Sequence, residues 1–508
     1  MCAEAAPLFL KSWRKRMIFK KSLIVLICCA LIICSIPFES NAASTNDALP
    51  YVLVSGMDVL PLYKTSESGK VKKVYPLTAG NALRLAADAL PALVRFVFDK
   101  DYEKLADKLF PATAKAFEAL KCDDNGKPLY DVTSQSYPLS VKNYPELYKN
   151  EKRDELGIIK AAVEKFGADK VYFYNYDWRL SPLDHVQGLR KLIETALRDH
   201  SCEKIDLACC SMGGNIVMSY LDEYGAEELR SVSLLSTAFQ GVDAVGAMLN
   251  GEICFKKDAV LRRLNDLGKT DLTASLYRFL TGFADKTGIA DKLIGFADTL
   301  IAKNRDKLYD ELLTPVFGSM PGIWALLNAD DYTKAKNYML DGKDSVLSDK
   351  TEHYLNNIQI NAKRILDSAK GDGANLYIVC QYNYQSLPVS LNTDINNDLM
   401  VDVKYASGGA VCADLGKTLP EGYKQTIQDG HDHISADRVI DASVCMFPEY
   451  TWFIKNQAHV DYPAGVSTDF LFTLSGSENQ PDVFSFKEYP QFTEYDYDTD
   501  TLTSLTHH

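Results

Sequence analysis

The stretch KIDLACCSMGGNIVMSYL, residues 204–221, constrains the fold of this chain more than any other. Five of the six residues 205–210 are apolar, without alternation. Such a run is typical of a strand buried on both faces of a parallel sheet. Residues 216–221 then carry apolar side chains at helical spacing. The stretch predicts a buried strand, a sharp turn and a helix.

Ser211 occupies the predicted turn. A serine on such an elbow exposes its hydroxyl at the start of a helix, whose N–H groups favour an anion. The usual pattern is G-x-S-x-G; here Gly213 is present and Cys209 stands in the earlier glycine position. Ser211 is therefore the predicted nucleophile. The alternative is an ordinary strand followed by a helix that Ser211 caps.

The N-terminus has the pattern of a secretory leader. Residues 12–21 hold five Lys and Arg, residues 22–38 are largely apolar, and small residues follow at Ser40 and Ala42. This pattern predicts a signal peptide over residues 1–43, cleaved after Ala42 or Ala43, and a secreted mature protein. Met17 is an alternative start, and an uncleaved membrane anchor is the alternative reading of the segment.

Length, charge and cysteines bound the class of protein. A chain of 508 residues has room for one large domain with a cap. The net charge of -13 argues against nucleic acid as a partner. Eight cysteines lie beyond the leader (12 − 4), of which Cys412 and Cys445 are candidates for a disulfide. No cofactor or metal is predicted, and the oligomeric state is open.

An early strand is predicted over residues 50–56, ending at Gly56. In an acyl-transfer enzyme one oxyanion donor follows the nucleophile and another lies on a loop after an early strand. The Met212 amide and that of Met57 or Asp58 fit these two places. A plain glycine turn is the alternative. Residues 80–150 then form a mostly helical insertion, whose apolar face is either core or a lipid-facing surface.

An aromatic strand over residues 170–176 ends in Asp177-Trp178-Arg179, and a helix leads from it into the Ser211 strand. The segment YDWRLSP at 176–182, followed by CSMGG at 210–214, resembles the lecithin:cholesterol acyltransferase-like family of α/β-hydrolases. The resemblance implies a mostly parallel sheet flanked by helices. Residues 231–241 are similar to the strand that in this family ends in a Thr-Pro-Phe-x-Gly turn. Residues 242–370 are predicted to form a helical cap or lid, or alternatively a separate helical domain.

The acid of a catalytic triad should follow the next strand, because the chain order in this fold is Ser, Asp, His. Residues 375–381 form that predicted strand. The resembling family has Asp-Gly-Asp-Gly-Thr-Val after it, where this chain has NNDLMV at 396–401. This alignment selects Asp398; the glycines and the threonine are absent, and Asp394 and Asp402 remain alternatives.

The base is expected on a late loop between the last strand and a closing helix. His459 follows the strand-like run 451–455 and precedes the helical pattern 466–474, which makes it the predicted base. His431 and His433 are the alternatives. The core is thus expected over residues 44–241 and 371–480, with an acidic tail at 481–508 outside it.

The resemblance implies a serine acyl hydrolase or O-acyltransferase that acts on a phospholipid or acylglycerol. Transient contact with a lipid surface is a further expectation. The alternatives are a secreted esterase for small or carbohydrate esters and a non-catalytic binding protein. Head group, acyl acceptor and disulfide pairing are not determined by the sequence.

Overall fold

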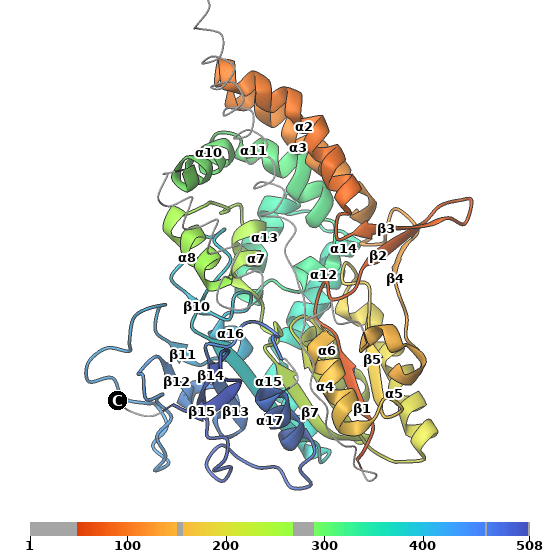
Figure 1. The fold of residues 1–508 in the computed structure, drawn as a ribbon, viewed down its shortest axis with the longest axis vertical. Coiled ribbons are helices and arrows are strands. Elements are labelled where there is room, and N and C mark those ends of the chain that lie inside the picture. Colours follow the sequence, from red (N-terminus) through yellow and green to blue (C-terminus); the bar gives the residue numbers. More distant parts are fainter. Residues whose placement is uncertain (1–47, 150–155, 268–288, 463–464, 506–508) are drawn as a thin grey trace, which may run out of the picture.

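The fold was analysed in a computed structural model, which describes residues 48–149, 156–267, 289–462 and 465–505. The predicted leader, residues 1–43, lies outside these ranges. Within them, none of the helices combines the length and apolar composition that crossing a bilayer requires. Figure 1 shows a sheet with its helices at one end of the molecule and a group of further helices stacked at the other.

One eight-stranded sheet organises the chain, in the order β15-β14-β13-β8-β7-β6-β1-β5. All neighbouring strands are parallel except β14 and β15, which pair antiparallel. This mostly parallel sheet confirms the predicted α/β class. The strands are β1 (Tyr51–Val54), β5 (Val171–Tyr174), β6 (Ile205–Cys210), β7 (Leu229–Leu235), β8 (Asn375–Tyr382), β13 (Thr451–Lys455), β14 (Phe492–Asp496) and β15 (Thr501–Ser504).

Helices cover both faces of the sheet, and the central strand β6 is accordingly buried along its whole length and apolar at five of its six residues. On β6, Leu207 and Cys209 belong to the hydrophobic cluster on one face, and Ala208 and Cys210 to the cluster on the other. The first face is covered by α5 (Val186–His200), α6 (Gly213–Tyr224) and α15 (Ala362–Gly371), and the second by α4 (Gly157–Phe166) and α17 (Val466–Ser475).

The described residues of the segment between β7 and α15 are mostly helical and lie above the sheet in Figure 1. Two helices inserted after β1 pack against it: α2 (Ala79–Asp99) and α3 (Tyr102–Ala116). Its described elements are α7 (Asp243–Leu249), α8 (Lys257–Leu267), α10 (Ile289–Lys303), α11 (Arg305–Leu308), η6 (Tyr309–Phe317), α12 (Pro321–Trp324), η7 (Ala329–Asp331), α13 (Tyr332–Met339), α14 (Val346–His353) and η8 (Tyr354–Gln359). We call it the cap.

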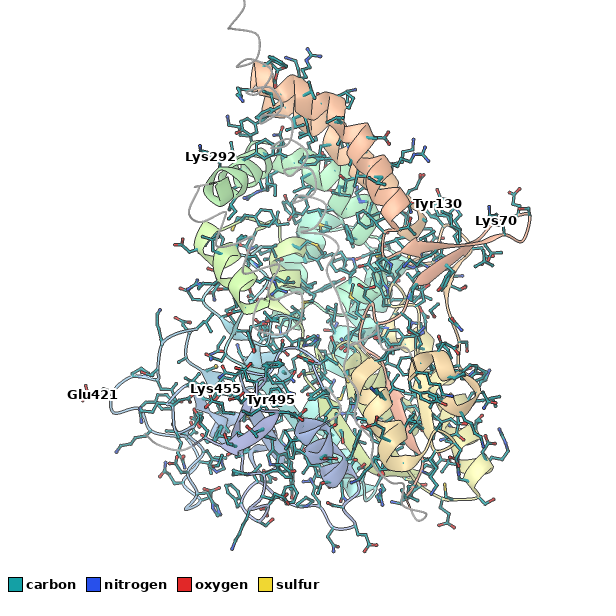
Figure 2. All side chains as sticks on the ribbon, in the orientation of Figure 1. Lys70, Tyr130, Lys292, Glu421, Lys455 and Tyr495 are labelled. Atoms are coloured by element: carbon teal, nitrogen blue, oxygen red, sulfur yellow. The ribbon has the colours of Figure 1, made fainter. Side chains whose placement is uncertain are left out.

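Three small sheets accompany the main sheet in the described residues. β2 (Leu62–Thr65) pairs with β3 (Val71–Tyr75) and β4 (Val132–Ser134), and Figure 2 shows Lys70 at the tip of the projecting β2–β3 hairpin. The other two lie in the region after β8: β9 (Tyr384–Gln385) with β10 (Asn396–Asn397), and β11 (Val411–Cys412) with β12 (Ile440–Asp441). α16 (Val403–Ala406) lies between these pairs in the chain.

The C-terminal segment differs from its expectation. The acidic residues after 481 predict a tail outside the core, but β14 and β15 form one edge of the main sheet. Phe492 and Tyr495 are buried on opposite faces of that edge, and Figure 2 shows Tyr495 beside Lys455 of β13. In the sequence, carboxylates alternate with these aromatic residues and give the segment an acidic, polar pattern. In the structure, the carboxylates lie at the edge of the sheet and in the turn between β14 and β15, while the aromatic residues are buried.

Two further expectations need correction. The insertion is helical only through α2 and α3; residues 118–147 form short 3₁₀ turns and β4 instead. The candidate pair Cys412 and Cys445 is not joined, since all eight cysteines that the structure describes are free thiols. Cys445 is buried, and burial raises the pKa of its thiol to about 12.

Candidate active site

Ser211 lies at a sharp turn between β6 and α6. Its φ of 50° falls in the left-handed region, which costs a non-glycine residue about 1–2 kcal/mol. Backbone hydrogen bonds hold this conformation: the Ser211 N–H donates to Leu235 O over 3.2 Å, and Ser211 O accepts from the N–H groups of Ala238 and Gly214 over 3.0 and 3.1 Å. The turn therefore has the geometry of a nucleophile elbow.

The glycines after Ser211 are required by close backbone approach. A Cβ on Gly213 would lie 2.5 Å from Ser55 O, and one on Gly214 would lie 2.6 Å from Thr237 Cβ. Cys209, in the place of the earlier glycine, fits because its thiol turns toward β7, with Sγ 3.6 Å from Ser233 O. Burial raises the pKa of the Cys209 thiol, so this group stays neutral.

The loop after β1 lies against the serine. A Cβ on Gly56 would come within 3.1 Å of Ser211 Cβ, so a side chain there would crowd the nucleophile. Among the described residues, the backbone N–H groups of Met57 and Met212 donate to no acceptor. Asp58, the other predicted donor, has a φ of 66° and accepts a hydrogen bond from Tyr75 Oη over 3.1 Å. This loop and the start of α6 can together supply N–H groups to an oxyanion.

Asp398 and His459 are brought together. His459 Nδ1 donates to Asp398 Oδ2 over 2.7 Å, and the His459 N–H donates to Asp398 O over 2.8 Å. The second carboxylate oxygen, Oδ1, accepts the N–H groups of Met400 and Val401 at 2.9 and 2.8 Å. Asp398 is thus buried with both oxygens satisfied, while 13% of the His459 side chain stays exposed.

The loop that carries His459 is held on both sides. Gln381, the penultimate residue of β8, accepts the Val460 N–H over 3.0 Å and the Ser236 hydroxyl over 2.6 Å. Ser236 directly follows β7. On the other side, the Ala458 N–H donates to Tyr497 Oη over 2.9 Å, which ties the loop to the turn between β14 and β15.

Gln381 is the structural link between the serine and the histidine. β6 pairs with β7 so that Cys210 lies opposite Leu235, and Gln381 connects the next residue, Ser236, to the histidine loop. No direct hydrogen bond joins Ser211 Oγ to His459 in the described structure, and His459 Nε2 is likewise without a described partner. In unliganded enzymes, such catalytic hydrogen bonds are often long and tighten with substrate.

The alternative acids occupy other environments. Asp394 is about half exposed and pairs with Arg262 of α8 over 2.9 Å. Asp402 is buried, but its two oxygens accept the Asp243 N–H and the Asn397 side-chain amide, at 2.8 and 3.0 Å. Burial raises the pKa of the Asp402 carboxyl to about 7. Neither carboxylate has a hydrogen bond to a histidine among the described residues.

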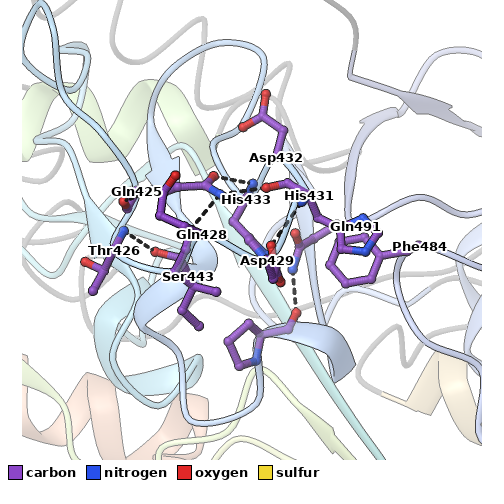
Figure 3. Close-up of polar contacts among 12 residues, drawn as sticks. Gln425, Thr426, Gln428, Asp429, His431, Asp432, His433, Ser443, Phe484 and Gln491 are labelled. Atoms are coloured by element: carbon purple, nitrogen blue, oxygen red, sulfur yellow. Dashed lines mark hydrogen bonds and ion pairs between the residues drawn. The ribbon is translucent and has the colours of Figure 1, made fainter.

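The alternative histidines form a separate cluster, which Figure 3 shows in close-up. His433 Nε2 lies 2.9 Å from Asp429 Oδ2, and the His431 ring stacks on Phe484 with centroids 3.7 Å apart. The hydrogen bond from His433 lowers the pKa of Asp429. Within the described parts of the chain, no group of three potential ligands is placed to hold a metal ion.

The Asp-Trp-Arg segment has a structural place in the fold. Arg179 is fully buried and forms a two-pronged pair with Asp177, at 2.9 and 2.6 Å. The same guanidinium donates to Leu120 O and Val132 O over 3.2 and 2.9 Å. It therefore joins the inserted segment after α3 to the core.

Sequence reasoning did not find Gln381 or Tyr497 as partners of the histidine loop. A signal existed for Gln381, because a lone amide at the end of an apolar strand points to a polar contact at the sheet's carboxyl edge. Tyr497 gave none, since it lies in the segment expected to be outside the core.

The parallel sheet, the elbow after β6, and an acid and a histidine following β8 and β13 define the class of α/β-hydrolases. Within that class, the sequence model of the family described as Lecithin:cholesterol acyltransferase matches residues 159–260. The resemblance seen in the sequence is thereby confirmed over the segment from α4 through the elbow to the first helices of the cap.

Other comparisons add little. No curated protein sequence matches the chain. Among solved structures, a chain of "The crystal structure of Tle4-Tli4 complex" is similar at 10% identity and a TM-score of 0.30, covering 66% of this chain and 75% of that one. A likeness this distant carries no argument here.

Proposed function

We propose that this protein is a serine acyl hydrolase or O-acyltransferase that acts on lipid esters. The hydrogen bond between Asp398 and His459, beside an elbow that exposes Ser211, is the observation that carries the proposal. The similarity of residues 159–260 to the lecithin:cholesterol acyltransferase family supports an acyl ester as the substrate and a lipid as its source.

The proposed reaction runs through an acyl-serine. His459, oriented by Asp398, takes the proton of Ser211 as its oxygen attacks the ester carbonyl. The N–H groups of Met212 and of Met57 or Asp58 stabilise the oxyanion. The C–O bond of the ester then breaks, and His459 returns its proton to the departing alcohol. Water or a second alcohol repeats the sequence and releases the acyl group from the serine.

Contact with a lipid surface is part of the proposal, and α2 supports it. Five large apolar residues are exposed on this helix, of which Leu83 and Phe98 are 72% and 80% exposed. Figure 1 shows α2 at the end of the molecule farthest from the sheet. An exposed amphipathic helix of this kind can lie in the interface of a bilayer. The five residues are Leu83, Leu90, Val94, Val97 and Phe98.

We further propose that the mature protein is secreted, on the basis of the leader-like pattern in residues 12–43. An extracellular location suits an enzyme that reaches its substrate at a lipid surface. Mass spectrometry of the N-terminus of the mature chain tests this directly: a start just after Ala42 or Ala43 supports secretion, and an intact leader supports the anchored alternative.

The function is tested by hydrolysis of p-nitrophenyl esters from acetyl to palmitoyl, with Ser211→Ala beside the parent protein. Activity that rises with chain length and is lost in the variant supports a lipid acyl hydrolase or transferase. A preference for acetyl supports the small-ester enzyme, and absence of Ser211-dependent activity in a folded protein supports the binding protein. Ser219→Ala is the matched control, because Ser219 lies on α6 and its hydroxyl donates to Asn215 O within the same helix.

A further inference from the structure

The turn that carries Asp398 contains a leucine in an unfavourable conformation. Leu399 has a φ of 97°, a left-handed value that suits glycine and not a side chain branched at Cγ. It stands where the family motif Asp-Gly-Asp-Gly-Thr-Val has its second glycine. In this shape the turn directs the N–H groups of Met400 and Val401 at Asp398 Oδ1.

Arg263, on α8 of the cap, contacts the main chain of Leu399. Its Nη1 donates to Leu399 O and, over 3.1 Å, to Gln385 O. Asp266, about one helical turn further along α8, accepts the Gln385 N–H over 2.8 Å. Through Arg263 and Asp266, α8 therefore forms hydrogen bonds with the main chain of β9 and with the carbonyl of Leu399 in the Asp398 turn.

We propose that Arg263 is a positioning residue for Asp398, which compensates for the missing glycine by fixing the carbonyl of Leu399. The inference rests on the proposed function, in which Asp398 orients His459. If Arg263 is lost, the peptide after Leu399 can rotate toward the more favourable right-handed region. That rotation withdraws the N–H groups from Oδ1 and turns Oδ2 away from His459 Nδ1.

In this arrangement a residue of the cap, Arg263, helps to position Asp398. A charged donor is suited to this place, because hydrogen bonds from a guanidinium are stronger than those from a neutral group and one nitrogen can serve two carbonyls. Arg262, the neighbouring residue, offers a matched comparison. It pairs with Asp394 at an exposed site, with 43% and 47% of the two side chains exposed, and it makes no described contact with the Asp398 turn.

The test uses the full-length mature protein and reads the Asp398–His459 bond without relying on activity. The Nδ1–H of His459 should give a downfield proton NMR signal, identified by its loss in His459→Gln. We expect the signal to disappear or shift in Arg263→Met and to stay in Arg262→Met. Ester hydrolysis should fall about tenfold to hundredfold in kcat in Arg263→Met, with KM little changed, as for other small misplacements of a catalytic group.

Leu399→Gly provides the decisive second variant. A glycine adopts the left-handed conformation without strain and does not need the hydrogen bond from Arg263. In the Arg263→Met background, the NMR signal and kcat should therefore return close to those of the parent. An unchanged signal in Arg263→Met would overturn the proposal, and so would a failure of Leu399→Gly to restore the signal. The two hypotheses have different readouts: a folded parent protein without any Ser211-dependent hydrolysis refutes the proposed function, whereas the NMR signal alone decides the role of Arg263.

Discussion

Asp398 divides its two carboxylate oxygens between two tasks: Oδ2 accepts His459 Nδ1–H over 2.7 Å, and Oδ1 accepts two backbone N–H groups of its own turn. The hydrogen bonds to Oδ1 fix the orientation of the carboxylate and thereby the direction in which Oδ2 points toward His459. A carboxylate held in this way keeps the imidazole in one tautomer and one orientation, which leaves Nε2 available for proton transfer.

Replacing the acid tests this arrangement. Asp398→Asn should lower kcat by about 10⁴-fold, because the amide cannot accept the Nδ1 proton in the same way and the imidazole takes the wrong tautomer. Asp394→Asn is the matched control and should leave kcat within about twofold, since Asp394 pairs with Arg262. Similar losses in the two variants, measured by ester hydrolysis, would contradict the assignment of Asp398.

The buried carboxyl of Asp402 predicts a pH effect on stability. Burial raises its pKa to about 7, whereas an unfolded aspartate ionises near pH 4. The folded state therefore binds the extra proton, so this contribution to stability is full below about pH 4 and is lost as the pH rises to about 7.

Asp402→Asn should remove that slope, since the amide cannot ionise and its oxygen can still accept the Asp243 N–H. We expect the fall in the free energy of unfolding between pH 4 and pH 8 to shrink by a few kcal/mol, as measured by urea denaturation. Parallel pH dependences for parent and variant would show that Asp402 is ionised throughout the folded state.

Arg179 should matter for stability more than for chemistry. Arg179→Met leaves the Asp177 carboxylate and the carbonyls of Leu120 and Val132 without their buried donor, which should cost about 3–5 kcal/mol in the free energy of unfolding. Arg95→Met is the control: its pair with Asp99 is exposed and should contribute about 0–1 kcal/mol. Equal effects in denaturant titrations would mean that the buried pair does not anchor the inserted segment.

The exposed face of α2 should determine binding to a lipid surface. Replacing Leu83 and Phe98 together by Ser removes two of its most exposed apolar side chains and should weaken binding to phosphatidylcholine vesicles at least tenfold. Ile360→Ser is the control, because Ile360 is also exposed, at 62%, but lies in the cap near α15. Co-sedimentation measures both; an equal loss in the two proteins, or none, argues against α2 as the contact.

The sequence was most informative where local physics decides the structure. The strand and helix around Ser211 are specified by a nearly continuous apolar run, two glycines and helical spacing, and β6 and α6 lie at these residues. Likewise, β8, β13 and α17 begin at the residues where the apolar patterns 375–381, 451–455 and 466–474 begin.

What the sequence could not provide are contacts between distant segments. Arg263 and Leu399 are separated by more than a hundred residues, and nothing local to either predicts their hydrogen bond. Tyr497 reaches the histidine loop only because β14 pairs with β13. The β2–β3 hairpin was missed for another reason: its strands are short, and β3 carries the exposed residues Val71 and Lys72, so its alternation is weak.

The most direct test of the central claim is covalent labelling of the folded protein by a long-chain alkyl phosphonate, followed by intact mass and peptide mapping. We expect one adduct per chain, on Ser211, which is absent in Ser211→Ala and forms far more slowly in His459→Gln. A folded protein that stays unlabelled, or that carries its adduct on another residue, would contradict the claim that Ser211 is an activated nucleophile.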